Sequence, residues 1–318
     1  TLAQMLYTSK ATVDKAVREL QAEGFLSAKT GSGTFVSQRL NGVADNMKNW
    51  CLILPDISID VYSKLAMGIT EVAAAINVNV VLYNSGHSVE KQAEYIERLI
   101  MSGIDGFIIV PVITTTADAT IKLYRSLIES KIPFVFCNRD IDGVNASIVK
   151  SNDFYGAYSA TLHLIERGYR DIVFLARQRY RTSIDRCQGY LSALQHMKLP
   201  IEYRRIIVLD TDDEKDCYIY LKALLKSNVP VDGVFCHNDI IAVEAGRCVQ
   251  DIGLRVSEDI GIIGYDDSDV CKMVTPQLTS VSYKAEDIGK IAARVLFQKV
   301  NGICTEFDNH LVEPEIVV

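Results

Sequence analysis

The chain lacks the patterns that mark membrane spans and metal sites. No apolar run approaches the roughly twenty residues that cross a bilayer, so we expect no contact with a membrane. None of the eight cysteines forms a Cys-x-x-Cys pair, and no two lie near a histidine at zinc-ligand spacing. Nor is there a nucleophile with a base, or a phosphate-binding loop. We therefore expect no metal, no cofactor and no enzymatic activity.

The cysteines favour a reducing compartment. They stand at positions 51, 137, 187, 217, 236, 248, 271 and 304, and three of them, Cys51, Cys137 and Cys236, lie in apolar runs typical of strands. Free buried cysteine behaves as a small hydrophobic residue. We interpret all eight as reduced thiols of a cytoplasmic protein.

Length and charge indicate more than one domain. A chain of 318 residues is expected to form two or three domains. The net charge is −7, but residues 1–40 hold five basic and three acidic groups, a balance of +2, which leaves −9 for the rest. The mildly basic start therefore differs in character from the acidic remainder.

Two glycines near the start, Gly31 and Gly33, raise the possibility of a phosphate loop. A P-loop needs Lys and Ser/Thr after its last glycine, whereas Thr34 and Phe35 follow here. Upstream lies a helical pattern, with apolar residues of 13–20 on one face and Gly24 as a cap. Residues 25–30 and 34–37 then predict two short strands joined by a glycine turn.

The order of helix, strand, glycine turn and strand describes a winged helix-turn-helix, with Thr8 or Ser9 capping the second helix. Residues 9–26 (SKATVDKAVRELQAEGFL) and 30–36 (TGSGTFV) resemble the DNA-binding domain of GntR-type transcription regulators. That family has a further helix ahead of this point, so we expect residues before Thr1.

The resemblance implies that the second helix enters the major groove and that the hairpin, the wing, lies beside the DNA backbone. Lys10 stands where the family usually has arginine, and Asp14 stands where arginine is common. These departures change the expected half-site. The residues predicted to contact DNA are Ser9, Lys10, Thr12, Lys15, Thr30, Gly31 and Gly33.

The rest of the chain predicts an α/β fold. Residues 1–37 form the predicted DNA-binding domain, 38–48 a polar linker, and 49–318 an effector-binding and dimerisation domain. In the last, nine apolar strand patterns alternate with amphipathic helices, which indicates doubly wound parallel sheets. So many units predict two lobes, near 48–150 and 153–278. The strands are expected at 50–54, 78–83, 106–110, 134–137, 171–175, 205–209, 233–236, 260–264 and 278–283.

An ordered set of motifs carries a second resemblance. The segments are 105–111 (DGFIIVP), 132–139 (IPFVFCNR), 152–156 (NDFYG), 164–172 (LIERGYRDI), 186–190 (RCQGY), 237–242 (HNDIIA), 260–267 (IGIIGYDD) and 275–281 (TPQLTSV). They resemble the effector-binding half of LacI/GalR repressors, which shares its fold with periplasmic sugar-binding proteins. Together with the GntR-type head, the chain resembles the AraR group of sugar-responsive repressors.

Ligands of open α/β sheets bind outside the carboxyl ends of the strands. That rule and the resemblance select eight residues at an interlobe cleft: Asp60, Tyr62, Asn138, Arg139, Phe154, Arg186, Asn238 and Asp266. Carboxylates, amides, guanidiniums and aromatic rings suit a sugar. Alternatives stay open: a helix cap for Asn238, a turn for Asp266, the core for Phe154, and surface ion pairs for the arginines. We interpret His87 and His237 as structural or rim residues.

The sequence thus predicts a repressor that binds operator DNA as a homodimer and responds to a monosaccharide in the cleft. The resemblance implies release of DNA by the sugar and suggests arabinose; other pentoses, fucose-like sugars and hexoses stay open. One alternative is a sugar-binding protein of a transport system, which leaves the winged helix unused. The other is an enzyme acting on a sugar or nucleotide, which lacks its catalytic groups.

Overall fold

The computed structural model describes residues 8–22, 26–29, 33–36, 47–112, 117–178, 181–209 and 215–318. The chain divides into two compact units, Thr1–Lys48 and Asn49–Val318. Among the described residues, no helix is both long and apolar enough to cross a bilayer.

The first unit holds a helix followed by a hairpin. Helix α2 spans Lys10–Ala22, and strands β1 (Leu26–Lys29) and β2 (Gly33–Val36) pair antiparallel, with Leu26 opposite Val36 and Lys29 opposite Gly33. Ser9 caps α2, since its Oγ accepts a hydrogen bond from the Thr12 backbone N–H at 3.1 Å. The glycine at the start of β2 is Gly33; the predicted turn residues Thr30 and Gly31 lie outside the described residues.

The second unit consists of two α/β lobes, as the sequence predicted. Within the described residues, lobe 1 contains a six-stranded sheet in the order β13-β7-β6-β5-β3-β4. Its strands are β3 (Lys48–Leu54), β4 (Val78–Asn84), β5 (Gly106–Ile109), β6 (Phe134–Cys137), β7 (Ser147–Ser151) and β13 (Asn309–Val312). Its helices are α3 (Asp60–Ala75), α4 (Val89–Met101), α5 (Ala117–Ser130) and α11 (Ala285–Val300).

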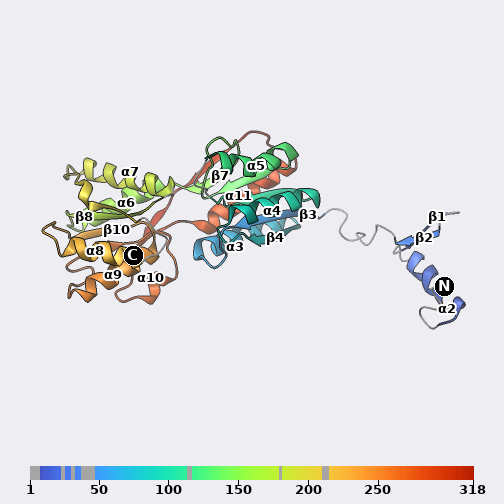
Figure 1. Ribbon diagram of the computed structural model, residues 1–318, viewed down its shortest axis with the longest axis horizontal. Helices are drawn as coiled ribbons and strands as arrows, with labels where there is room; N and C mark the ends of the chain where they lie inside the picture. Colours follow the sequence, from blue (N-terminus) through green and yellow to red (C-terminus); the bar gives the residue numbers. More distant parts are fainter. Residues whose placement is uncertain are drawn as a thin grey trace. The chain divides into compact units, whose positions relative to one another are not determined.

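Lobe 2 contains a four-stranded parallel sheet in the order β11-β10-β8-β9 and the small sheet β12-β14. Its strands are β8 (Ile172–Arg177), β9 (Ile206–Leu209), β10 (Gly233–Cys236), β11 (Gly261–Ile263), β12 (Ser280–Ser282) and β14 (Glu315–Val317). Its helices are α6 (Asp153–Glu166), α7 (Arg181–His196), η2 (Tyr203–Arg205), α8 (Lys215–Leu225), α9 (Asp239–Asp251) and α10 (Val270–Met273). Figure 1 shows the helices of each lobe around its sheet.

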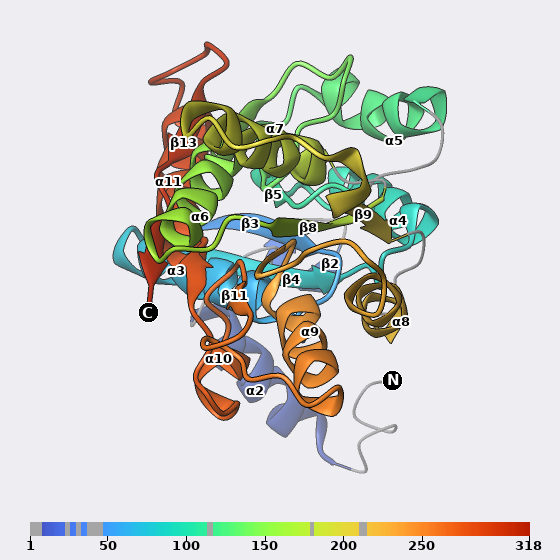
Figure 2. The same ribbon diagram turned by 90° about the vertical axis from the view of Figure 1, so that its left-hand side faces the viewer.

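Alternation of buried side chains along the strands explains why both faces of each sheet are covered. In β3, Leu52 packs in the cluster under α3 and α11, whereas Cys51 and Ile53 pack under α4 and α5. In β8, Phe174 packs under α6 and α7, whereas Val173 packs under α8 and α9. Figure 2 looks onto lobe 2 and shows these helix pairs on opposite sides of its sheet.

The chain crosses between the lobes three times: from β7 into α6, from β12 into α11, and from β13 into β14. The C-terminal helix α11 therefore belongs to lobe 1, where it crosses α3 at close range. A Cβ atom on Gly289 of α11 would lie 2.2 Å from the Leu65 carbonyl oxygen, and one on Gly68 of α3 would lie 2.0 Å from the Glu286 carbonyl oxygen. The two glycines allow the helix backbones to touch.

We predict that Gly289→Ala destabilises the protein by about 1–3 kcal/mol, because the added methyl group meets backbone that cannot rotate away. The matched control is Gly246→Ala in α9, where the nearest atoms lie 3.9 Å from the new Cβ. Both changes gain the same helix propensity, so the control should be neutral or stabilising by up to about 1 kcal/mol. Urea unfolding checks both, and equal effects would contradict the close-packing argument.

Candidate effector cavity

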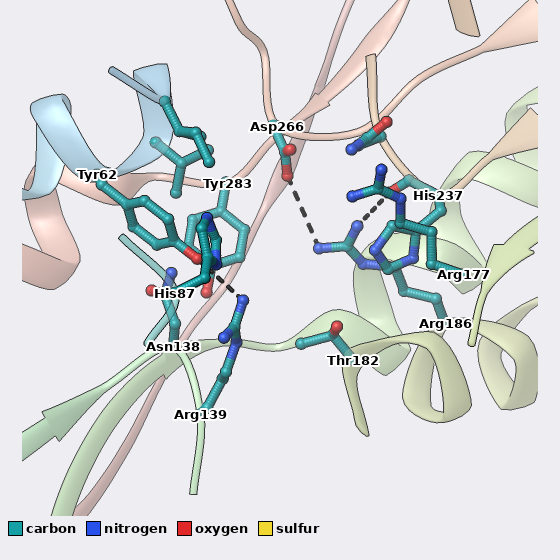
Figure 3. A pocket seen from close by; sticks show the side chains of 13 residues that line it. Tyr62, His87, Asn138, Arg139, Arg177, Thr182, Arg186, His237, Asp266 and Tyr283 are labelled. Carbon is teal, nitrogen blue, oxygen red and sulfur yellow. Dashed lines mark hydrogen bonds and ion pairs between the residues drawn. The ribbon is translucent and has the colours of Figure 1, made fainter. Parts of the chain in front are cut away.

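A cavity of about 130 Å³ lies where strand ends of the two lobes face each other (Figure 3). Its walls mix charged, amide, hydroxyl and aromatic groups with two aliphatic side chains. The lining residues are Ile59, Val61, Tyr62, His87, Asn138, Arg139, Arg177, Thr182, Arg186, His237, Asn238, Asp266 and Tyr283. Six of the eight residues predicted for the cleft are among them: Tyr62, Asn138, Arg139, Arg186, Asn238 and Asp266.

On the lobe 1 side of the cavity, Arg139 and Tyr62 are joined by a hydrogen bond. Arg139 follows β6, and its guanidinium donates to the Tyr62 hydroxyl at 2.9 Å and to the Pro111 carbonyl at 3.2 Å. The preceding Asn138 has φ = 66°, a left-handed conformation that asparagine tolerates better than most residues. Its side-chain Oδ1 is buried and has no hydrogen-bond partner among the described residues. A buried acceptor without a partner is costly unless a ligand satisfies it.

Arg186 organises the wall of lobe 2. It is buried, so the alternative of a surface ion pair does not hold for it. Its Nε donates to Asp153 Oδ1 at 2.7 Å, and a second nitrogen donates to the His237 carbonyl. The guanidinium carbon lies 3.5 Å from the ring centroid of Tyr265. Burial works to lower the Arg186 pKa, but Asp153 and other neighbours outweigh it and raise the pKa, so the charge is retained.

Asp266 faces Arg186 without a direct hydrogen bond. The closest carboxylate oxygen lies 3.8 Å from the guanidinium nitrogen, and the side chain is 23% exposed. Burial raises the pKa of this carboxyl, and Arg186 opposes the shift. A ligand hydroxyl between the two groups can donate to the carboxylate and accept from the guanidinium.

Asn238 has two roles in the geometry. It lines the cavity, and its Oδ1 also accepts from the Ile241 backbone N–H at 2.9 Å, which caps α9. The cap that the sequence left as an alternative is therefore present. The amide nitrogen is the part that a ligand can use, because the cap already occupies the oxygen.

Asp60 and Phe154 do not line the cavity. Asp60 lies in the first turn of α3, where its carboxylate is 2.6 Å from Lys64 Nζ. Phe154 lies on α6, is 41% exposed, and stacks on Tyr158 with ring centroids 6.4 Å apart. It is therefore not a core residue either.

Sequence reasoning missed Ile59, Val61, Arg177, Thr182 and Tyr283. Arg177 ends β8, so the strand-end rule that selected Arg139 would have selected it as well. Thr182 lies in the first turn of α7, after residues outside the described ranges. Tyr283 follows β12 at a crossing between the lobes. It is the last residue of the strand expected at 278–283, so the strand-end rule would have selected it as well.

The two histidines both line the cavity. His87, at φ = 58°, follows β4. His237 is buried, and its Nδ1 lies 3.1 Å from the Ser183 hydroxyl. Burial lowers the His237 pKa well below 6.5, and the cations of Arg186, Arg177 and Arg139 lower it further. Its imidazole is therefore neutral at neutral pH and can donate or accept one hydrogen bond at each nitrogen.

The candidate DNA-contacting residues whose side chains the structure describes are exposed. Ser9, Lys10, Thr12 and Lys15 all belong to the solvent-facing part of α2 or its cap, and Lys15 lies 3.9 Å from Glu19 as an exposed i,i+4 pair. Such a pair contributes little to stability, which leaves the lysine available for other contacts.

Comparison with known proteins agrees with the two-lobed unit. A family model described as a periplasmic binding protein-like domain matches residues 161–318. The HTH-type transcriptional repressor PurR of Pasteurella multocida is 30% identical over 74% of this chain and 70% of its own length. The arabinose metabolism transcriptional repressor of Geobacillus stearothermophilus is 26% identical over 100% of this chain and 88% of its own length.

Among solved structures, a LacI family transcriptional regulator of Enterococcus faecium with bound ribose matches with a TM-score of 0.71. It is 27% identical, and the match covers 85% of this chain and 97% of that one.

We predict that His237 makes the protein less stable in acid. Below pH 6.5 the unfolded chain binds a proton at this histidine and the folded chain does not. The free energy of unfolding therefore decreases as the pH is lowered. From pH 7.5 to 5.5, the wild type should lose more stability than His237→Gln, by about 1 kcal/mol. Urea unfolding of both proteins at both pH values checks this. His163, whose pKa is also lowered, is present in both proteins, so its contribution cancels in the comparison. Parallel losses would contradict a neutral buried imidazole.

Proposed function

Because the chain belongs to the LacI family of periplasmic-binding-protein-like transcription regulators, we propose that it represses transcription by binding operator DNA under the control of a monosaccharide. Like the repressors it matches, it is a regulator and not an enzyme. The observation that carries the proposal is the cavity between the lobes, whose polar groups come from both of them.

The groups of the cavity suit the hydroxyls of a sugar. A hydroxyl donates one hydrogen bond and accepts others, so it satisfies a carboxylate and a guanidinium at once. Asp266 and Arg186, 3.8 Å apart, offer such a pair, and Asn138 Oδ1 offers a buried acceptor that needs a donor. Tyr62 and Tyr283 add aromatic surface for the apolar face of the ring.

A pentose is the favoured effector. One relative in the family was solved with ribose, and the repressor that matches the whole chain controls arabinose metabolism. Because one extra methyl or methylene changes affinity by only about 1–3 kcal/mol, fucose-like sugars and hexoses belong in the test.

For control of DNA binding, the sugar must bind one arrangement of the lobes better than the other. A ligand that contacts Arg139 in lobe 1 and Asp266 in lobe 2 favours the closed arrangement. In a homodimer, closure changes the spacing of the two DNA-binding heads and thereby releases the operator. Binding to chromosomal DNA places the protein in the cytoplasm.

For the head, we propose a GntR-type winged helix-turn-helix over residues 1–37, joined by a linker at 38–48 to the effector domain at 49–318. Support comes from the order of α2, β1 and β2 and from the arabinose repressor, whose match extends over this segment. The proposed DNA contacts are Ser9, Lys10, Thr12, Lys15, Thr30, Gly31 and Gly33.

The proposal predicts that a monosaccharide stabilises the full chain against thermal unfolding. The panel is L-arabinose, D-ribose, D-xylose, L-fucose, D-glucose and D-galactose. At about a hundred times its dissociation constant, a ligand that binds only the folded state adds about 2.7 kcal/mol. A panel in which no sugar shifts the unfolding temperature would overturn the sugar assignment.

We further predict that Asn138→Gly weakens binding of the stabilising sugar about tenfold, since it removes the acceptor but tolerates the left-handed backbone. Asn138→Asp keeps an oxygen acceptor and should bind within about threefold of the wild type. Phe154→Ala, outside the cavity, should leave affinity unchanged. Calorimetric titration checks the three variants; a loss confined to Phe154→Ala would place the sugar elsewhere.

A further inference from the structure

A lysine links the two lobes beside the cavity. Lys64, in the second turn of α3 in lobe 1, places its Nζ 2.6 Å from Asp60 Oδ2 and donates to the Asp267 carbonyl of lobe 2 at 2.9 Å. We infer that Lys64 is a positioning residue that holds the loop carrying Asp266 against lobe 1, and that Asp60 holds Lys64.

The surroundings of Lys64 fit this role. Its side chain is 33% exposed and that of Asp60 is 29% exposed, so water competes less for the pair than at an open surface. Burial works to lower the Lys64 pKa, but the hydrogen bond and charge of Asp60 and the nearby Asp269 and Asp267 outweigh it and raise the pKa. The ammonium group is thus charged and has donors for both lobes.

The loop that Lys64 contacts contains two consecutive residues with positive φ angles. Asp266 has φ = 111°, which is unfavourable for residues other than glycine. Asp267 has φ = 53°, a left-handed conformation that aspartate tolerates better than most residues. Within lobe 2, the Asp267 N–H donates to Ser280 Oγ at 3.1 Å and the Ser268 N–H donates to Asp239 Oδ2 at 2.7 Å. Lys64 adds a contact from the other lobe to the same turn.

The contact joins two walls of the cavity. Helix α3 carries Tyr62 two residues before Lys64, and the contacted carbonyl belongs to the residue after Asp266. Breaking the contact should therefore lower the population of closed molecules. The apparent affinity of a ligand that needs the closed state falls by that fraction. In this respect the inference rests on the proposed function.

A second pair also spans the lobes, but it is more exposed. Arg181 of α7 lies 2.9 Å from Asp142 of lobe 1, with side chains 52% and 87% exposed. Exposed pairs contribute little because solvent screens them. Lys64, with half-buried partners, is the stronger link.

The test compares Lys64→Met, which keeps the length of the side chain and removes its charge, with Lys64→Arg. The matched control is Lys290→Met. Lys290 Nζ bridges Glu71 at 2.9 Å and Glu286 at 2.8 Å, both within lobe 1, and its side chain is 24% exposed. It is a bridging lysine of the same kind that does not link the lobes.

Hydrogen exchange of the full chain without any sugar is measured first. Lys64→Met should raise exchange of the amides at 264–268 and 59–64 about fivefold. Lys64→Arg should restore most of the protection, and Lys290→Met should leave both segments unchanged. Unchanged exchange in Lys64→Met, or the same increase in Lys290→Met, would overturn the inference.

Calorimetric titration with the stabilising sugar of the panel is the second readout. Lys64→Met should weaken binding about fivefold and Lys290→Met should not. If no sugar of the panel binds, the proposed function fails, and the exchange experiment still decides whether Lys64 links the lobes. If exchange rises but affinity is unchanged, the part of the inference that concerns the effector is overturned.

Discussion

The buried guanidinium of Arg186 is the constraint around which the cavity is organised. A charge removed from water must be paired and hydrogen-bonded, because leaving it alone costs several kcal/mol. Asp153, at the start of α6, supplies the paired charge, the His237 carbonyl supplies an acceptor, and the Tyr265 ring supplies a face. Three elements of lobe 2 are thus held in one arrangement, with the remaining side of the guanidinium turned to Asp266.

The groups around Arg186 are linked to lobe 1 through the three segments at which the chain crosses between the lobes. Asp153 begins α6, the helix that follows the first crossing. The preceding residue, Asn152, donates its backbone N–H to the Val312 carbonyl at 2.9 Å, and Val312 lies beside the third crossing. Tyr283 lies at the second crossing and lines the cavity. The cavity therefore lies next to the segments that connect the lobes, where a small ligand can contact both of them.

Much of this was predictable from the sequence, for a physical reason. Strands buried on both faces, such as 134–137, are continuous apolar runs, and parallel strands place the residues that follow them at one edge. That is how Asn138, Arg139, Asn238 and Asp266 were selected. The strand β7 was not predicted, because its sequence, SIVKS, is short and polar at both ends.

Other features depend on the assembled fold. The link between Lys64 and Asp267 joins residues 203 apart in the sequence. The sequence shows no sign of their proximity. Asp60 was predicted to contact the effector because it follows the first strand of lobe 1, but its carboxylate pairs with Lys64 instead. Phe154 was predicted for the cleft from the resemblance, but its ring is exposed, stacks on Tyr158 and does not line the cavity.

The most direct test of the account is selection of DNA by the full chain, followed by release. A pool of random-sequence duplexes is enriched on the protein without sugar, and the affinity of the recovered duplex is measured with and without the stabilising monosaccharide. The account predicts an inverted repeat, as expected for a dimer, whose affinity falls at least about tenfold with the sugar but much less in Asn138→Gly at the same sugar concentration. Failure to enrich any sequence, or an affinity that no stabilising sugar changes, would contradict it.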